Sequence, residues 1–120
     1  MGAWGTAAWD NDGAADWFAE LFEKSKLATR VEKTLKKKDV EEYHEEIRAA
    51  AHIVVALGEN FIWPVDVLDK HLKLAIEKLE AIKQLEEYSQ EPDQVSAIDT
   101  DIATLRSRLR QSTESGQESS

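Results

Sequence analysis

The sequence contains no cysteine and few of the residues that form turns. The absence of cysteine excludes a disulfide-stabilised fold, a thiol nucleophile and any zinc or iron–sulfur site with cysteine ligands. Two prolines and five glycines in 120 residues are too few for an all-β protein, which needs many turn residues. These absences point to a helical protein.

The sequence also lacks long apolar runs and an excess of positive charge. No stretch of about 18 uninterrupted apolar residues occurs, so we expect no helix that spans a membrane. The N-terminus lacks the basic-then-apolar order of a secretory signal, and we therefore expect a cytoplasmic protein. The 24 acidic and 15 basic residues give a formal net charge of −9, which argues against nucleic-acid binding and favours a basic protein as partner.

Apolar side chains recur every three or four residues along most of the chain, which is typical of amphipathic helices. We expect Asp39 to be an N-cap and Gly58 to be a left-handed C-cap. The spacing predicts helices over residues 13–25, 27–37, 40–57, 65–90 and 94–111. The fold class is therefore all-α: a compact antiparallel bundle of four to five helices.

The two ends of the chain differ from the periodic part. Residues 1–9 hold two tryptophans and two glycines, and we expect them to form an extended arm that packs on the bundle. Residues 112–120 contain no apolar side chain, so we expect a disordered polar tail. The domain prediction is one helical domain over residues 1–111, followed by this tail.

Two expectations about burial bear on a possible site. We expect the first helix to bury one apolar face, made of Ala14, Trp17, Phe18, Leu21 and Phe22. His52 lies inside an apolar run, so we expect it to be buried and neutral, with one hydrogen-bond partner.

The first residues of the chain resemble a known family. The run Met1-Gly2-Ala3-Trp4-Gly5-Thr6, followed by Trp9-Asp10-Asn11-Asp12 and Ala15-Asp16-Trp17, is similar to the opening of the domain of unknown function 4259 family. The alanines at 49–51 resemble the second region of that family, which precedes a long helix. The likeness covers most of residues 1–90 and is specific at the N-terminus.

The resemblance implies a small, mostly bacterial, cytoplasmic protein, and it implies no activity, because the family has no established one. Some small acidic helical proteins of this kind occur near toxin systems as immunity proteins, which is an analogy at the level of class. The chain departs from the family where His52 stands in place of a glutamate, and where Lys83-Gln84-Leu85 and Tyr88 replace a Ser-Glu-Leu and tryptophan pattern.

Motifs for metals and catalysis are incomplete in this sequence. Residues 10–13 begin like a calcium loop, but neither register places ligands at the required later positions. The spacing of Glu41 and His44 matches one half of a di-iron site, and the second half is missing. Gly2 and Thr6 fit the loose N-myristoylation pattern, which only a eukaryotic host would use. We expect no metal, no cofactor and no catalytic residue.

Two functions remain open on this sequence. The first is a non-catalytic protein-interaction module, monomeric or homodimeric, that presents a charged face to a basic partner. The second is an enzyme or small-ligand protein with a pocket between the N-terminal arm, residues 58–64 and the helix over 40–57. The candidate pocket or partner residues are Trp4, Trp9, Asp12, Asp16, Trp17, His52 and Trp63.

Overall fold

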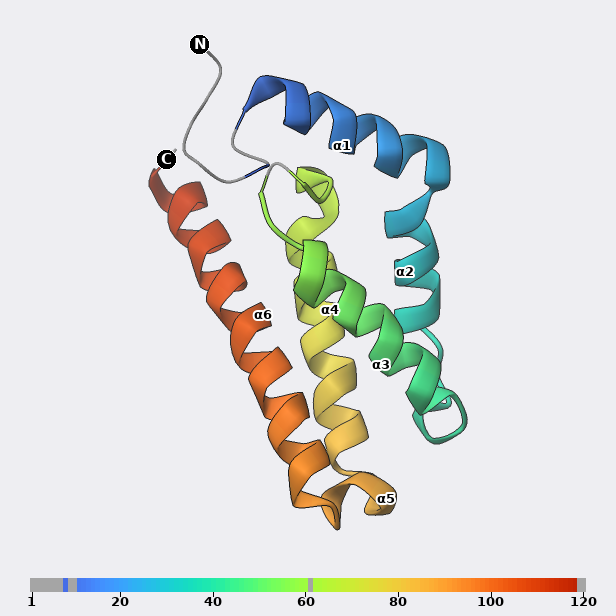
Figure 1. Cartoon of the computed structure of the whole chain (residues 1–120). Helices are drawn as coiled ribbons and strands as arrows, with labels where there is room; N and C mark the ends of the chain where they lie inside the picture. Colours follow the sequence, from blue (N-terminus) through green and yellow to red (C-terminus); the bar gives the residue numbers. More distant parts are fainter. Residues whose placement is uncertain (1–7, 9–10, 61, 119–120) are drawn as a thin grey trace.

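The computed structural model describes residue 8, residues 11–60 and residues 62–118, with side chains as far as residue 110 (Figure 1). All of the regular structure in these residues is helical, which confirms the predicted all-α class. The expected arm at residues 1–9 lies almost wholly outside the described residues. The helices are α1 (Asp12–Ser25), α2 (Leu27–Leu35), α3 (Val40–Leu57), α4 (Val65–Lys83), α5 (Glu86–Ser89) and α6 (Pro92–Glu118).

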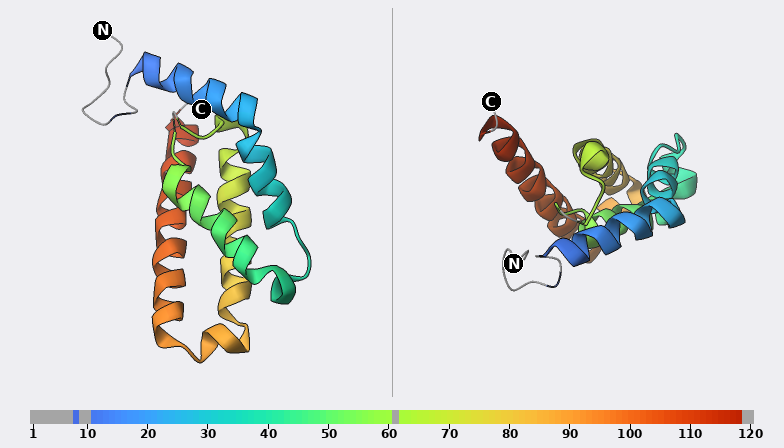
Figure 2. Two further views of the ribbon diagram at one scale, coloured as in Figure 1. Left: turned by 45° about the vertical axis from the view of Figure 1, so that its right-hand side comes forward. Right: turned by 90° about the horizontal axis from the view of Figure 1, so that it is seen from above.

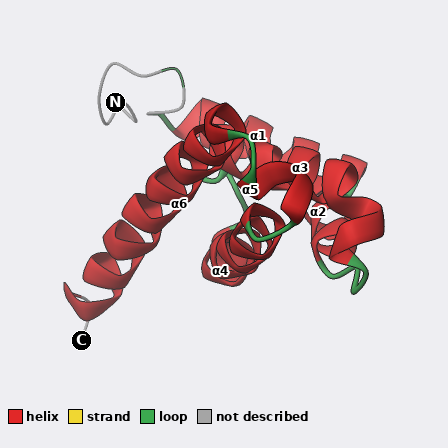
Figure 3. Cartoon of the chain, turned by 90° about the horizontal axis from the view of Figure 1, so that it is seen from below, coloured by secondary structure: helices red, strands yellow, loops and turns green. Residues whose placement is uncertain are grey.

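The helix α4 is the centre of the bundle, because it contacts α2, α3, α5 and α6. Figure 2 shows α4 and α6 running antiparallel beside each other, with α3 crossing them obliquely. The helix α2 lies on the side of α3 away from α6. The first helix, α1, lies across one end of this bundle and contacts α2 (Figures 1 and 2). The helices α1 and α5 lie at opposite ends of the bundle in Figure 1, and in the view from below α5 lies in front of α1 (Figure 3).

The core consists of the periodic apolar positions that the sequence predicts. The inward face of α4 repeats every three or four residues, as expected for a buried helical stripe. The buried residues on α4 are Leu68, His71, Leu72, Ala75, Leu79 and Ile82. Those on α3 are Ile47, Ala50, Ala51 and Val54, and those on α6 include Ile98, Ile102 and Leu105.

Side chains cap several helix ends. The Asn11 side chain accepts a hydrogen bond from the Ala14 amide at 2.8 Å, and Asp39 accepts one from the Glu42 amide at 3.0 Å. Both bonds satisfy amide groups that have no partner within the helix, so the prediction of Asp39 as an N-cap is confirmed. At the other end of α3, the Arg108 guanidinium donates to the carbonyl oxygens of Val54 and Val55, which ties α6 to α3.

Several helix boundaries differ from the prediction. The helix α1 begins at Asp12 rather than at 13. The helix α2 ends at Leu35 rather than at 37, and α6 runs over Pro92–Glu118 rather than 94–111. Between 92 and 115 no glycine and no second proline interrupts α6, so its backbone can continue past the last apolar contact. Disorder of residues 112–120 stays a prediction.

The expected single helix over residues 65–90 is wrong, because the chain breaks after α4. Leu85 is extended, with φ −65° and ψ 140°, and the short helix α5 follows it. The turn brings Tyr88 to α3, where its hydroxyl lies 2.6 Å from Nδ1 of His44 and the side chain is buried. Apolar spacing continues through the turn, so it did not reveal the break.

The expected left-handed conformation of Gly58 is also wrong. Gly58 has φ −79° and ψ 59°, and the left-handed residue is Lys26, with φ 57°, between α1 and α2. Gly58 is required for a different reason: a Cβ atom there would lie 2.4 Å from the Val54 carbonyl oxygen. Close approach of the backbone, rather than positive φ, therefore selects glycine at this position.

We expect alanine to have opposite effects at two glycines. Gly58→Ala should lower the free energy of unfolding by about 1–3 kcal/mol, because the backbone must move to admit the methyl group. Gly13→Ala should raise it by about 0.5–1 kcal/mol, because Gly13 is helical and its added Cβ meets only the Asn11 side chain at 3.5 Å. Urea unfolding followed by circular dichroism measures both changes. Effects of the same sign would contradict the conclusion that Gly58 is required by close packing and Gly13 is not.

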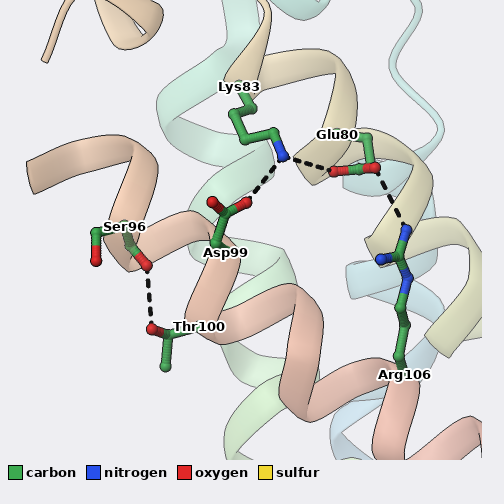
Figure 4. A network of polar contacts seen from close by, with 6 residues as sticks. All are labelled: Glu80, Lys83, Ser96, Asp99, Thr100 and Arg106. Atoms are coloured by element: carbon green, nitrogen blue, oxygen red, sulfur yellow. Dashed lines mark hydrogen bonds and ion pairs between the residues drawn. The ribbon is translucent and has the colours of Figure 1, made fainter. Parts of the chain in front are cut away.

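An exposed charge network joins α4 to α6 (Figure 4). The Lys83 ammonium donates to Asp99 at 2.8 Å and lies 3.3 Å from Glu80, whose second oxygen is 3.3 Å from Arg106. Asp99 and then Glu80 raise the pKa of Lys83 above its ordinary value. Because water screens exposed ion pairs, this network contributes little to stability.

Candidate functional site

A groove of about 820 Å³ lies between α1, the α1–α2 turn and the segment that leads into α4. Its walls are mainly apolar, and its charged residues are Glu23, Lys26 and Asp66. The groove exists because α1 lies across the end of the bundle instead of packing along it (Figure 2). The lining residues are Ala15, Ala19, Phe22, Glu23, Lys26, Ala28, Thr29, Asn60, Ile62, Trp63, Pro64, Val65, Asp66 and Val67.

The buried floor of the groove is formed around Trp63. This residue is 2% exposed, and its ring meets Phe22 edge to face, with the ring centroids 5.0 Å apart. Its indole N–H donates to Nδ1 of His71 at 3.0 Å. A buried tryptophan needs such a partner, and this bond fixes the orientation of the ring.

His71 is the buried polar residue behind this floor, with 1% of its surface exposed. The indole nitrogen can only donate, so Nδ1 of His71 must accept and the proton of the neutral ring lies on Nε2. Nε2 then donates to the Glu32 carboxylate at 2.7 Å. The chain of bonds from Trp63 through His71 to Glu32 connects the residues before α4, α4 itself and α2.

Glu32 ends this chain at the surface, where two lysines neutralise it. Its oxygens lie 3.0 Å from the Lys36 ammonium and 3.2 Å from that of Lys70. The hydrogen bond from His71, followed by those from Lys36 and Lys70, lowers the pKa of Glu32 from 4.5 to about 2. Glu32 is therefore ionised throughout the neutral range, and both ring nitrogens of His71 are occupied.

The low pKa of Glu32 predicts a specific pH dependence of stability. A carboxylate whose folded pKa is depressed stabilises the fold above its unfolded pKa, and this contribution disappears as the pH falls from about 4.5 to about 2. The advantage of the wild type over Glu32→Gln should therefore shrink over this interval, by about 1–2 kcal/mol once screening of the exposed lysines is allowed for. Urea unfolding of both proteins at pH 6, 4, 3 and 2 measures it.

A matched variant separates this effect from general acid unfolding. Glu41→Gln removes an exposed carboxylate in the first turn of α3. Its stability relative to the wild type should change little with pH. If the stability differences of Glu32→Gln and Glu41→Gln from the wild type change alike between pH 6 and pH 2, the low pKa of Glu32 is wrong.

Only some of the predicted site residues lie at the groove. Trp63 forms its floor, as described, whereas Asp12 and Asp16 are exposed on α1 and do not line it. Trp4 and Trp9 lie outside the described residues. Of the helix over 40–57, which was expected to form one wall, no residue lines the groove.

Three predicted burials are wrong, those of Trp17, Leu21 and His52; Leu21 is 38% exposed. Trp17 is 60% exposed, because Phe18 and Phe22 occupy the inner side of α1. His52 is exposed, because α3 turns Ala50, Ala51 and Val54 toward the core and leaves position 52 facing water. The apolar run around His52 predicted its burial, but the helices that pack on α3 leave the side with His52 uncovered.

His71 and Glu32 were not predicted as residues of the site. His71 follows Leu68 by three residues and precedes Ala75 by four, so it occupies the apolar stripe of α4. That position was a usable signal, because a polar residue on a buried stripe needs a bonding partner. Its partner Glu32 is 39 residues away, and nothing local identifies it.

The partial di-iron motif has another role in the structure. His44 contacts Tyr88, and its other ring nitrogen lies 3.3 Å from Glu87. In the described part of the chain, no three histidine, aspartate or glutamate side chains are placed to share a metal ion. None of the described helices is both long and apolar enough to cross a membrane.

Comparison with known proteins identifies the family. No curated protein and no solved structure matches the chain. A family model with the description "Domain of unknown function (DUF4259)" matches residues 2–118, which is nearly the whole chain and agrees with the resemblance of its N-terminus. The chain therefore belongs to the DUF4259 family.

Proposed function

We propose that this protein is a non-catalytic interaction module of the cytoplasm, and that its groove binds apolar side chains of a basic partner protein. The observation that carries the proposal is the groove itself. Its volume of about 820 Å³ can accept several side chains of a partner. Buried apolar anchors in such concave sites supply most of the energy of protein association.

The chemistry of the groove supports binding rather than catalysis. A catalytic site needs a nucleophile or base that can reach the substrate. His71, the titratable group nearest the floor, is buried behind Trp63, and both of its ring nitrogens are already bonded. Trp63 and His71 therefore hold the shape of the groove and take no part in chemistry there.

The charge around the groove supports a basic partner. Glu23, Lys26 and Asp66 line it, so its charged residues are negative on balance. With a net charge of −9, the whole molecule attracts positively charged proteins. Electrostatic attraction raises the association rate, and the apolar groove slows dissociation. A basic toxin neutralised by an immunity protein is one partner of this class.

A groove-filling variant tests the proposal. Ala19 is exposed and lines the groove, so Ala19→Trp should fill it without disturbing the core. Ala97→Trp places the same side chain on the exposed surface of α6 and serves as the matched control. Immobilised wild type and Ala97→Trp should retain the same basic protein from lysate of the native host, and Ala19→Trp should lose it.

The outcomes distinguish the proposal from its rivals. Equal retention by all three proteins would place the binding site elsewhere, and retention of no protein at low salt would reject the interaction role. Native mass spectrometry of protein purified from the host tests the small-ligand alternative. A bound small molecule present in the wild type and absent in Ala19→Trp would replace a protein partner with a small apolar ligand.

A further inference from the structure

The turn between α3 and α4 forms one wall of the groove. Asn60, Ile62 and Trp63 line the groove from this turn, and Trp63 supplies the buried floor. The turn begins tightly, because the Gly58 amide donates to the Val54 carbonyl oxygen at 2.7 Å. The contacts that hold this turn in place therefore decide the shape of the groove.

The backbone of Glu59 holds the turn from within. Its carbonyl oxygen accepts hydrogen bonds from the amide of Ile62 at 3.1 Å and from that of Trp63 at 3.0 Å. Two amides bonded to one oxygen fix the course of the backbone up to Trp63. The position of Glu59 therefore sets the position of Trp63.

Arg108 of α6 contacts both the start of the turn and Glu59. Its guanidinium donates to the carbonyl oxygens of Val54 and Val55 at the end of α3. Its Nε lies 3.9 Å from the Glu59 carboxylate, and the Arg108 side chain is only 19% exposed, so water screens this pair less than a surface pair. The planar guanidinium presents several N–H groups in fixed directions, so one side chain can hold both partners.

We propose that Arg108 is a positioning residue of the groove. It does not line the groove, but it fixes the turn that carries Trp63, through the end of α3 and through Glu59. A binding site depends on such supporting contacts to keep its walls in place. The effect on binding rests on the proposed function, whereas the position of Trp63 is a property of the free protein.

Nuclear magnetic resonance of the ¹⁵N-labelled free protein tests the position of Trp63. The indole N–H signals of Trp63 and Trp17 are identified by their absence from the corresponding phenylalanine variants. Arg108→Ala should shift the Trp63 signal by more than its linewidth and leave that of the exposed Trp17 unchanged. Arg108→Lys keeps a cationic donor and should shift the Trp63 signal less than Arg108→Ala does.

Arg106→Ala is the matched control, because it removes an exposed arginine from the same helix, where its partner is Glu80. Each alanine variant removes one positive charge, so a difference between the two cannot come from net charge. Arg106→Ala should leave the Trp63 signal at its wild-type position.

Glu59→Gln tests the second contact of Arg108 alone, and it keeps the test valid if Arg108→Ala does not fold. It leaves the bonds from Arg108 to α3 in place and removes the charge that Nε faces. It should also shift the Trp63 signal, by less than Arg108→Ala does. A wild-type Trp63 signal in Arg108→Ala or in Glu59→Gln, or an equal shift in Arg106→Ala, would overturn the proposal.

Retention of the basic protein measures the consequence for binding. Immobilised Arg108→Ala should retain at least about 10-fold less of this protein than the wild type does, and Arg106→Ala should retain as much as the wild type. A shifted Trp63 signal with unchanged retention would reject the groove as the binding site and support the positioning role. An unshifted signal would reject the positioning role whatever the retention.

Discussion

Trp63→Ala should lower the free energy of unfolding by about 3–5 kcal/mol. The substitution removes a side chain that is 2% exposed, opens a cavity against Phe22 and leaves Nδ1 of His71 without its donor. A small domain is stable by only about 5–15 kcal/mol, so a large share of the total would be lost. Urea unfolding followed by circular dichroism measures the loss without depending on tryptophan fluorescence.

Trp63→Phe separates the packing of this residue from its hydrogen bond. The phenyl ring keeps the aromatic contact with Phe22 but cannot donate to His71, so the expected loss is about 1–3 kcal/mol. The matched control is Trp17→Phe, which should cost less than about 0.5 kcal/mol because Trp17 is 60% exposed. Equal losses for the two phenylalanine variants would show that Trp63 does not hold the floor of the groove.

The helices and the core were largely predictable, because both follow from local periodicity. The bounds of α3 match the predicted 40–57, and Asp39 caps it as its side-chain chemistry predicts. The buried stripe of α4 follows the apolar spacing from Leu68 to Ile82. A helix that buries one side must repeat apolar residues at the helical period, so this information is written in neighbouring positions.

The break between α4 and α5 was not predictable in this way. Leu85 and Tyr88 continue the apolar spacing of α4, so the local pattern indicates one long helix. The chain turns instead, and Tyr88 reaches His44, which is 44 residues earlier in the sequence. A contact over such a distance leaves no trace in the pattern of either segment.

The candidate site was predictable only in part, for the same reason. Trp63 stood out as a tryptophan in a short connection, and it does form the floor of the groove. Whether a histidine on α3 or α4 is buried depends on which side of each helix is covered, and this is decided by the directions in which the helices cross. Those directions also create the groove, so its walls could not be derived from spacing alone.

Leu79→Ala should also lower the free energy of unfolding by about 3–5 kcal/mol. Leu79 is fully buried on α4, the helix that contacts α2, α3, α5 and α6, so a cavity there weakens the centre of the bundle. The rigid helices around the site can close such a cavity only partly. Thermal unfolding should show a midpoint at least about 10 °C below that of the wild type.

Val65→Ala is the matched control, because Val65 lies on the same helix and is 75% exposed. It should change the free energy of unfolding by less than about 0.5 kcal/mol. Both variants should keep the dependence of unfolding on urea concentration seen in the wild type, because neither changes the surface that unfolding exposes. Similar losses at Leu79 and Val65 would mean that α4 is not the central helix, and the groove that its N-terminus helps to form would lose its support.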